Sequence, residues 1–141
     1  MLQFDRKRLH SEPLVSIVVP MFDEEEMIPV FFLGIRSVLE LPGVRYEVVC
    51  VNDGSCDRTL DLLLEFASGD PRILVIDLSR NFGKEAALSA GLARAGGDAV
   101  IVIDADLQDP PELIPTFIER WRDGADVVIG VRVDRTSDTF L

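Results

Sequence analysis

Residues 46–66, YEVVCVNDGSCDRTLDLLLEF, place a candidate strand, a polar turn and a candidate helix in immediate succession. Residues 46–51 form a nearly continuous apolar run, which is typical of a strand that is buried on both faces of a sheet. Residues 57–66 carry leucines on one side, and Asp57 can cap the first turn of that helix. The stretch therefore predicts one β-α unit of an α/β fold.

The same alternation extends in both directions from this unit. The expected strands are residues 14–19, 46–51, 73–76, 99–103 and 126–129, and the expected helices are residues 24–40, 57–66, 83–95 and 111–121. Regular alternation of this kind favours an α/β sandwich with a mostly parallel central sheet, right-handed crossovers and helices on both faces.

Composition excludes several classes of function. The 141 residues predict one domain, and 48% hydrophobic residues are enough for a packed core. A net charge of -11 argues against nucleic acid as a partner and against spontaneous binding to an anionic membrane. Two cysteines are too few for a disulfide framework, and neither a signal peptide nor a run of ~20 apolar residues is visible. We therefore expect a cytoplasmic location.

Polar clusters follow all five expected strands. Ligands of open α/β sheets bind at the carboxyl ends of the strands, so these clusters are expected to converge on one site. They are residues 20–26, 52–55, 77–84, 104–109 and 130–132, and most of them are acidic.

The sequence Asp104-Ala105-Asp106 is the sharpest of these features. Two aspartates two positions apart at the end of a strand project to the same side, where their charges repel unless a cation lies between them. With the amide oxygen of Gln108 nearby, the carboxylates suit a hard divalent ion such as Mg2+ or Mn2+. Asp-x-Asp alone is weak evidence for a metal site, and its position after a buried strand makes that evidence stronger.

Other residues of the clusters have both a binding and a structural interpretation. Asp53 could accept hydrogen bonds from a nucleotide base or a ribose hydroxyl, or simply belong to a turn. Glu24 could face a ligand, or be favoured in a first helical turn by the helix dipole. Arg80, Lys84 and Arg132 could hold a diphosphate, or pair with neighbouring carboxylates.

Five ordered motifs together resemble a known family. They are VVPMFDEE at 18–25, VNDGSCDRT at 51–59, RNFGKEA at 80–86, DADLQDPPE at 104–112 and VIGVR at 128–132. The set is similar to the nucleotide-sugar-binding half of a family 2 glycosyltransferase with the Rossmann-like GT-A fold. The RNFGK and DLQDPPE segments resemble the polyprenyl-phosphate branch, which holds dolichyl-phosphate mannosyltransferases and undecaprenyl-phosphate glucosyl- and aminoarabinosyl-transferases.

The resemblance implies a role for each matching position. Asp53 would recognise the base, and Arg132 would contact the phosphates. Phe22 keeps a stacking face where the family commonly has Tyr, and Asp23 adds a negative charge where Asn is usual. The implied catalytic residues are Asp104, Asp106 and Arg132, the implied metal ligands are Asp104, Asp106 and Gln108, and the implied donor-binding residues are Pro20, Phe22, Glu24, Asp53, Gly83 and Lys84.

The resemblance also implies an activity and a division of the chain. The family inverts the sugar configuration, and we expect transfer from a UDP-sugar, rather than GDP-mannose, to a polyprenyl phosphate. Residues 1–13 are expected to form a flexible arm, residues 14–131 the nucleotide-sugar-binding domain, and residues 132–141 the truncated start of an acceptor-side segment. We expect a donor-binding fragment with little or no transfer activity and possible self-association. Membrane association, at the cytoplasmic face, would come through parts that this sequence lacks.

Two other classes stay open at this point. A haloacid-dehalogenase-type phosphatase also uses Asp-x-Asp after a strand, but normally after its first strand. A phospho-receiver signalling module has this length and needs an aspartate after its third strand, a place that Asp77 could take. A dinucleotide oxidoreductase is disfavoured because Gly-x-Gly-x-x-Gly does not follow the first expected strand.

Overall fold

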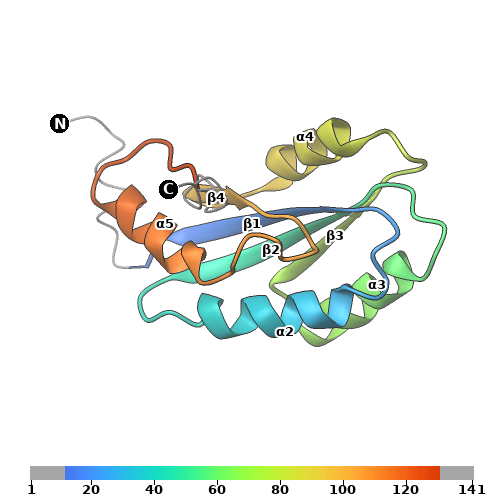
Figure 1. Ribbon diagram of the computed structural model, residues 1–141, viewed down its shortest axis with the longest axis horizontal. Helices are drawn as coiled ribbons and strands as arrows, with labels where there is room; N and C mark the ends of the chain where they lie inside the picture. The colour runs from blue at the N-terminus through green and yellow to red at the C-terminus, as the bar shows by residue number, and fades with distance from the viewer. Residues whose placement is uncertain (1–11, 131–141) are drawn as a thin grey trace, which may run out of the picture.

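The computed structural model describes residues 12–130, and its centre is a four-stranded sheet (Figure 1). The strands are β1 (Leu14–Met21), β2 (Arg45–Asn52), β3 (Ile73–Asp77) and β4 (Ala99–Val102). They lie in the order β3-β2-β1-β4, and every neighbouring pair is parallel. This order is that of the first four strands of a Rossmann sheet and differs from the 2-1-3-4-5 order of flavodoxin-like receiver modules.

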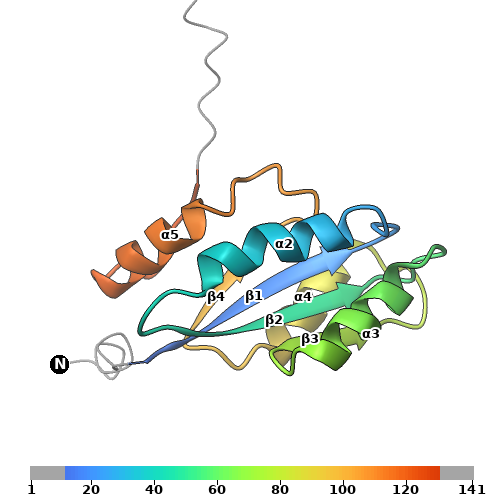
Figure 2. The same cartoon turned by 90° about the horizontal axis from the view of Figure 1, so that it is seen from below.

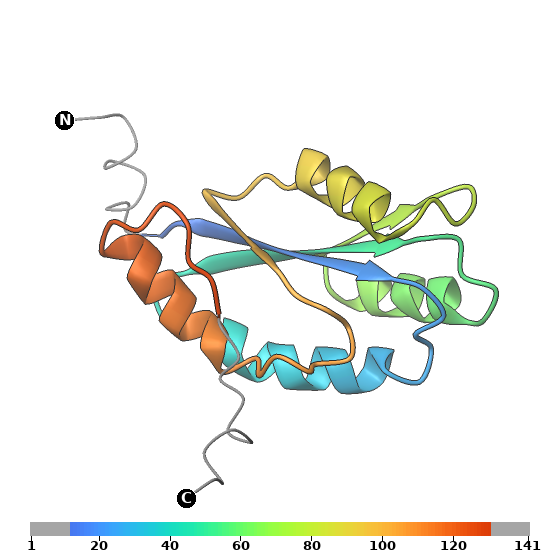
Figure 3. The same cartoon turned by 45° about the horizontal axis from the view of Figure 1, so that its top comes forward.

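Helices cover both faces of the sheet, as the alternation predicts (Figures 2 and 3). Helices α2 (Ile28–Leu39) and α3 (Thr59–Gly69) lie on one face, and α4 (Lys84–Arg94) lies on the other. Helix α5 (Leu113–Arg122) packs beside α2 at the end of the sheet away from the strands' carboxyl ends. The molecule is an α/β sandwich, and the fold class expected from the sequence is confirmed.

Burial on both faces explains the continuous apolar runs of the central strands. On one face, Ile17 and Val19 of β1 join Phe31 and Ile35 of α2 in the main core, where all four are at most 1% exposed. On the other face, α4 approaches closely at Gly91. A Cβ atom there would lie 2.4 Å from Cγ1 of Val18, so only glycine fits.

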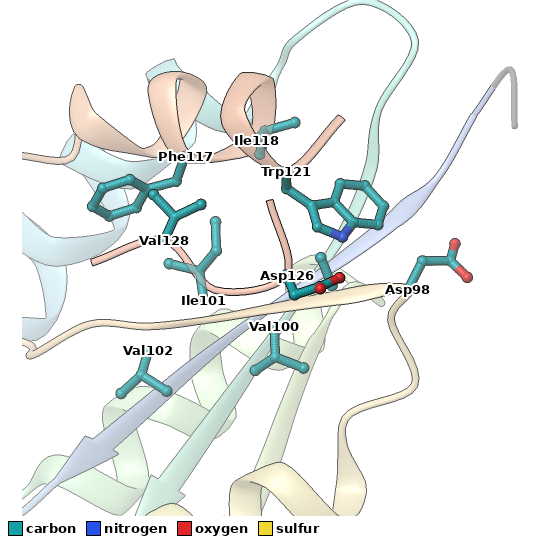
Figure 4. Close-up of a pocket in the computed structure, with 10 residues that line it drawn as sticks. Asp98, Val100, Ile101, Val102, Phe117, Ile118, Trp121, Asp126 and Val128 are labelled. Carbon is teal, nitrogen blue, oxygen red and sulfur yellow. The ribbon is translucent and has the colours of Figure 1, made fainter. Parts of the chain in front are cut away.

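The predicted fifth strand is wrong for the described residues. Residues 126–130 form no ladder; they lie beside β4 and α5, where Val127 and Ile129 are 76% and 75% exposed. Asp126 and Val128 line a hollow of about 460 Å³ between β4 and α5, with Phe117 among the residues that line it (Figure 4). β-branched residues suit a strand, but a strand forms only where its backbone finds a hydrogen-bonding partner.

Helix starts are later than the sequence predicts. The chain from Glu24 to Met27 forms a turn in which the Glu24 carbonyl accepts the N–H groups of Met27 and Ile28 at 3.0 and 3.2 Å, so α2 begins only at Ile28. Asp57 lies two residues before α3 and accepts a hydrogen bond from the Thr59 N–H at 2.9 Å. The domain boundaries stay predictions, because residues 1–11 and 131–141 lie outside the described part.

Candidate functional site

A cavity of about 290 Å³ opens where β1, β2 and β4 end. Its lining comes from four separate segments of the chain, which the parallel sheet brings to one edge. Among the described residues, every site residue expected from the sequence except Gln108 lines it. The lining residues are Pro20, Met21, Phe22, Glu24, Asp53, Asn81, Gly83, Lys84, Asp104, Ala105 and Asp106.

Asp53 lies at the floor of this cavity and is 3% exposed. Its Oδ1 accepts the N–H of Phe82 at 2.8 Å, and its Oδ2 accepts the N–H of Gly83 at 3.1 Å. Hydrogen bonds to a carboxylate are roughly twice as strong as neutral ones. Asp53 therefore holds the loop before α4 in place, a role that the sequence did not reveal. Its contact with a nucleotide base stays a prediction.

Gly54 allows the same loop to lie against the end of β2. Its φ is +67°, and a Cβ atom there would lie 2.2 Å from the backbone nitrogen of Asn81. The Asn81 side chain donates to the Asp53 carbonyl at 3.2 Å, and the Arg80 guanidinium lies 4.3 Å from the centre of the Phe82 ring. The loop is thus fixed by backbone contacts on one side and by Asp53 on the other.

Lys84, the first residue of α4, forms an ion pair across the cavity. Its Nζ lies 2.8 Å from Oδ1 of Asp104, and both side chains are partly exposed. The hydrogen bond to Asp104, together with the charges of Asp104 and Asp106, raises the pKa of Lys84. Lys84 is the one cationic side chain among the lining residues, where it faces several carboxylates.

Glu24, a further carboxylate of the lining, lies where its ionised form is disfavoured. Burial raises the pKa of the Glu24 carboxyl above its usual 4.5, and the charges of Asp106 and Asp104 raise it further. Because folding disfavours the ionised form, the penalty is present above the folded pKa and disappears as pH falls toward 4.5.

We expect Glu24→Gln to raise the melting temperature of the metal-free protein at pH 7. The gain should be about 1–3 °C, because the carboxyl is largely solvent-screened. It should vanish as the pH is lowered toward 4.5. Differential scanning calorimetry in EDTA measures it, with Glu26→Gln, a change at an exposed neighbour, as the control. Equal melting temperatures for wild type and Glu24→Gln at pH 7 would show that folding does not disfavour the ionised Glu24 carboxyl.

Asp23 does not line this cavity. Its Oδ1 accepts the Cys56 N–H at 2.7 Å, while its own N–H donates to the Ser55 hydroxyl at 3.0 Å. Its φ of 49° lies in the left-handed region, where Asp and Asn are enriched among non-glycine residues. Asp23 therefore joins the loop after β1 to the loop after β2, and its charge is used in that contact.

Two expected site residues remain to be placed, Gln108 and Arg132. The Gln108 N–H donates to Oδ1 of Asp106 at 3.2 Å, while Gln108 itself lines a separate hollow beside α5. Arg132 lies outside the described residues. Within residues 12–130, no three His, Cys, Asp or Glu side chains are grouped closely enough to form a complete metal site on their own. The carboxylates of Asp104 and Asp106 in one cavity still form the hard oxygen set that a divalent ion prefers.

Asn81 is a lining residue that the sequence analysis did not single out. It lies within the quoted RNFGKEA motif, between the flagged Arg80 and Lys84. Its role depends on the contact between the loop before α4 and the end of β2, which residue spacing alone does not reveal.

The geometry also bears on the alternative classes. Asp77, the candidate acceptor of a receiver module, accepts a hydrogen bond from the Asn52 amide at 2.9 Å and does not line the cavity. Asp104 and Asp106 follow β4, whereas the phosphatase pair normally follows the first strand.

No helix within the described residues is long and apolar enough to cross a membrane.

Two solved structures with a similar fold contain a nucleotide or a nucleotide-sugar. A mannosyltransferase from Pyrobaculum calidifontis, in complex with GDP-Man and Mn2+, is 28% identical with a TM-score of 0.59, over 69% of this chain and 28% of that one. Glucosyl-3-phosphoglycerate synthase from Mycobacterium tuberculosis, in complex with UDP, is 25% identical with a TM-score of 0.64, over 86% of this chain and 44% of that one.

Sequence comparison gives a stronger match. The bactoprenol glucosyl transferase of Shigella phage SfV is 52% identical over 127 residues, which are 90% of this chain and 41% of that protein. This chain thus spans about two fifths of that relative's length. The sequence model of the family described as Glycosyl transferase family 2 matches residues 16–141. On this match, together with the fold and the acidic cavity, the chain belongs to glycosyltransferase family 2.

Proposed function

We propose that this chain forms the donor-binding part of an enzyme that transfers a sugar from a UDP-sugar to a polyprenyl phosphate with inversion of configuration. The observation that carries the proposal is the acidic cavity at the carboxyl edge of the sheet, in a chain that is 52% identical to a bactoprenol glucosyl transferase. The acceptor would be used at the cytoplasmic face of a membrane, with the membrane-binding parts supplied outside this chain.

A divalent ion, Mg2+ or Mn2+, fits the residues of this cavity. Asp104 and Asp106 would hold it, because both carboxylates line one cavity in which Lys84 is the single cationic side chain. When bound, the ion would act as a Lewis acid that offsets the charge of the donor diphosphate and of the departing nucleoside diphosphate. The mannosyltransferase of the same fold was solved with Mn2+.

The remaining residues of the cavity would bind and orient the donor. The half-exposed ring of Phe22 offers a face on which a base can stack, and Pro20 lies beside it in the lining. Asp53 fixes the loop that carries Lys84, whose ammonium group can reach a diphosphate. Arg132 is proposed as a further phosphate contact.

The acceptor requires little activation by the protein. A phosphate monoester has a second pKa near ~6, so a lipid phosphate is mostly a dianion at neutral pH. It can attack the anomeric carbon without a strong general base. The cavity therefore has to position the donor and balance its charge rather than remove a proton.

Donor binding and transfer test the proposal separately. In Mn2+, we expect UDP-glucose at about 100 times its Kd to stabilise the chain by about 2.7 kcal/mol, with a smaller effect of GDP-mannose. With undecaprenyl phosphate and radiolabelled UDP-glucose, we expect little glycolipid from this chain and efficient formation by a longer protein that includes it. Stabilisation by no nucleotide-sugar would contradict donor binding, and release of phosphate from p-nitrophenyl phosphate would favour the phosphatase class.

A further inference from the structure

The ammonium group of Lys84 forms an ion pair with one of the two aspartates that are proposed to hold the metal. Its Nζ lies 2.8 Å from Oδ1 of Asp104, a full ion-pair contact. An ammonium group and a divalent cation are both positive, so they cannot share that carboxylate oxygen without strong repulsion. A divalent cation bound at this oxygen of Asp104 would therefore have to take the place of the Lys84 ammonium group.

The backbone beneath Lys84 is fixed by hydrogen bonds, while its side chain is exposed to solvent. Gly83 is held by Asp53 at 3.1 Å, and its carbonyl accepts the Ala87 N–H at 3.0 Å in the first turn of α4. The Lys84 side chain is 61% exposed and that of Asp104 is 45% exposed. The ammonium group can thus leave Asp104 by rotation of its side chain, without any movement of the loop.

We propose that Lys84 is exchanged for the divalent cation at Asp104 and that the released ammonium group then binds the donor diphosphate. This inference rests on the proposed function. The exchange makes the two ligands cooperative, because the metal must break the ion pair and the diphosphate gives the displaced lysine a new partner. By linkage, the nucleotide tightens metal binding by the same factor by which the metal tightens nucleotide binding.

Calorimetric titration of Mn2+ into wild type and Lys84→Met tests the exchange. Without nucleotide, we expect Lys84→Met to bind Mn2+ about 2–5-fold more tightly, the range that an exposed ion pair allows. With UDP present, we expect the tightening of Mn2+ binding to be smaller in Lys84→Met than in wild type. Arg94→Met removes the same charge from the exposed far end of α4 and should behave as wild type.

A spectroscopic readout follows the lysine itself. The sequence contains two lysines, Lys7 and Lys84, so reductive 13C-methylation gives a simple spectrum in which Lys84→Met assigns the signal. Diamagnetic Mg2+ should move the Lys84 signal toward its position in Asp104→Asn, where the partner charge is gone, and UDP should then move it again. The Lys7 signal should stay in place.

The outcomes separate this inference from the function on which it rests. Mn2+ affinity that is equal in wild type and Lys84→Met, or a Lys84 signal that Mg2+ leaves unmoved while Mg2+ binds, would overturn the exchange and leave the function intact. Failure of Mn2+ to bind any variant, with or without UDP, would overturn the metal-dependent function and the exchange together.

Discussion

Replacement of Gly54 by alanine is expected to destabilise the domain by about 2–4 kcal/mol. The backbone at Gly54 has a φ of +67°, a conformation that costs an L-residue about 1–2 kcal/mol. The added Cβ would also lie 2.2 Å from the backbone nitrogen of Asn81 and 2.3 Å from the carbonyl carbon of Arg80. Because both neighbours are backbone atoms, relief requires that the whole loop moves away from Asp53.

Urea unfolding of wild type and Gly54→Ala measures this loss. Gly69→Ala is the matched control, since no atom lies within 4 Å of a Cβ there, and it should change stability by less than about 1 kcal/mol. We expect Gly54→Ala to weaken UDP binding as well, because the displaced loop carries Lys84. If Gly54→Ala were as stable as wild type, the loop before α4 would not depend on its close contact with Gly54.

The Asp106→Asn variant is expected to lose Mn2+-supported UDP binding by about 100-fold or more. Mutation of residues that only orient metal ligands already lowers metal affinity by about 10–100-fold, so the loss of a ligand charge should lower it at least as much. The change keeps the size of the side chain and lowers the repulsion around Glu24, so the metal-free fold should not suffer.

Isothermal titration of UDP in the presence of Mn2+ measures the effect of Asp106→Asn. Asp61→Asn makes the same chemical change at an exposed position of α3 and should bind UDP as wild type does. Thermal unfolding of the metal-free variant shows whether the fold is intact. A reduction of less than about fivefold in UDP affinity would show that Asp106 is not a metal ligand.

Local sequence patterns predicted the elements and the edge at which the site lies. The apolar runs marked the four strands because those strands are buried on both faces, and parallel strands necessarily bring their carboxyl ends together. That logic predicts that Glu24, Asp53, Lys84 and Asp104 lie near one another.

The contacts that the sequence did not reveal are long-range and directional. Asp53 and Gly83 are thirty positions apart, and no spacing rule indicates that a buried carboxylate will accept two backbone N–H groups there. Gln108 was assigned to the metal by proximity in sequence, yet its side chain lines another hollow, because the chain turns at Leu107 with a φ of 55°. Residues 126–129 have strand-like composition, but β4 does not form a ladder with them.

Titration of UDP into the wild-type chain, once with Mn2+ and once with EDTA, tests the central claim most directly. The claim is that Asp104 and Asp106 accept an anionic donor only through a divalent cation, since the cavity is itself negatively charged. The account predicts clear binding of UDP in Mn2+ and binding that is weaker by about 100-fold or more in EDTA, since removal of the metal costs at least as much as the loss of one of its ligands. Equal UDP affinity under both conditions would contradict it.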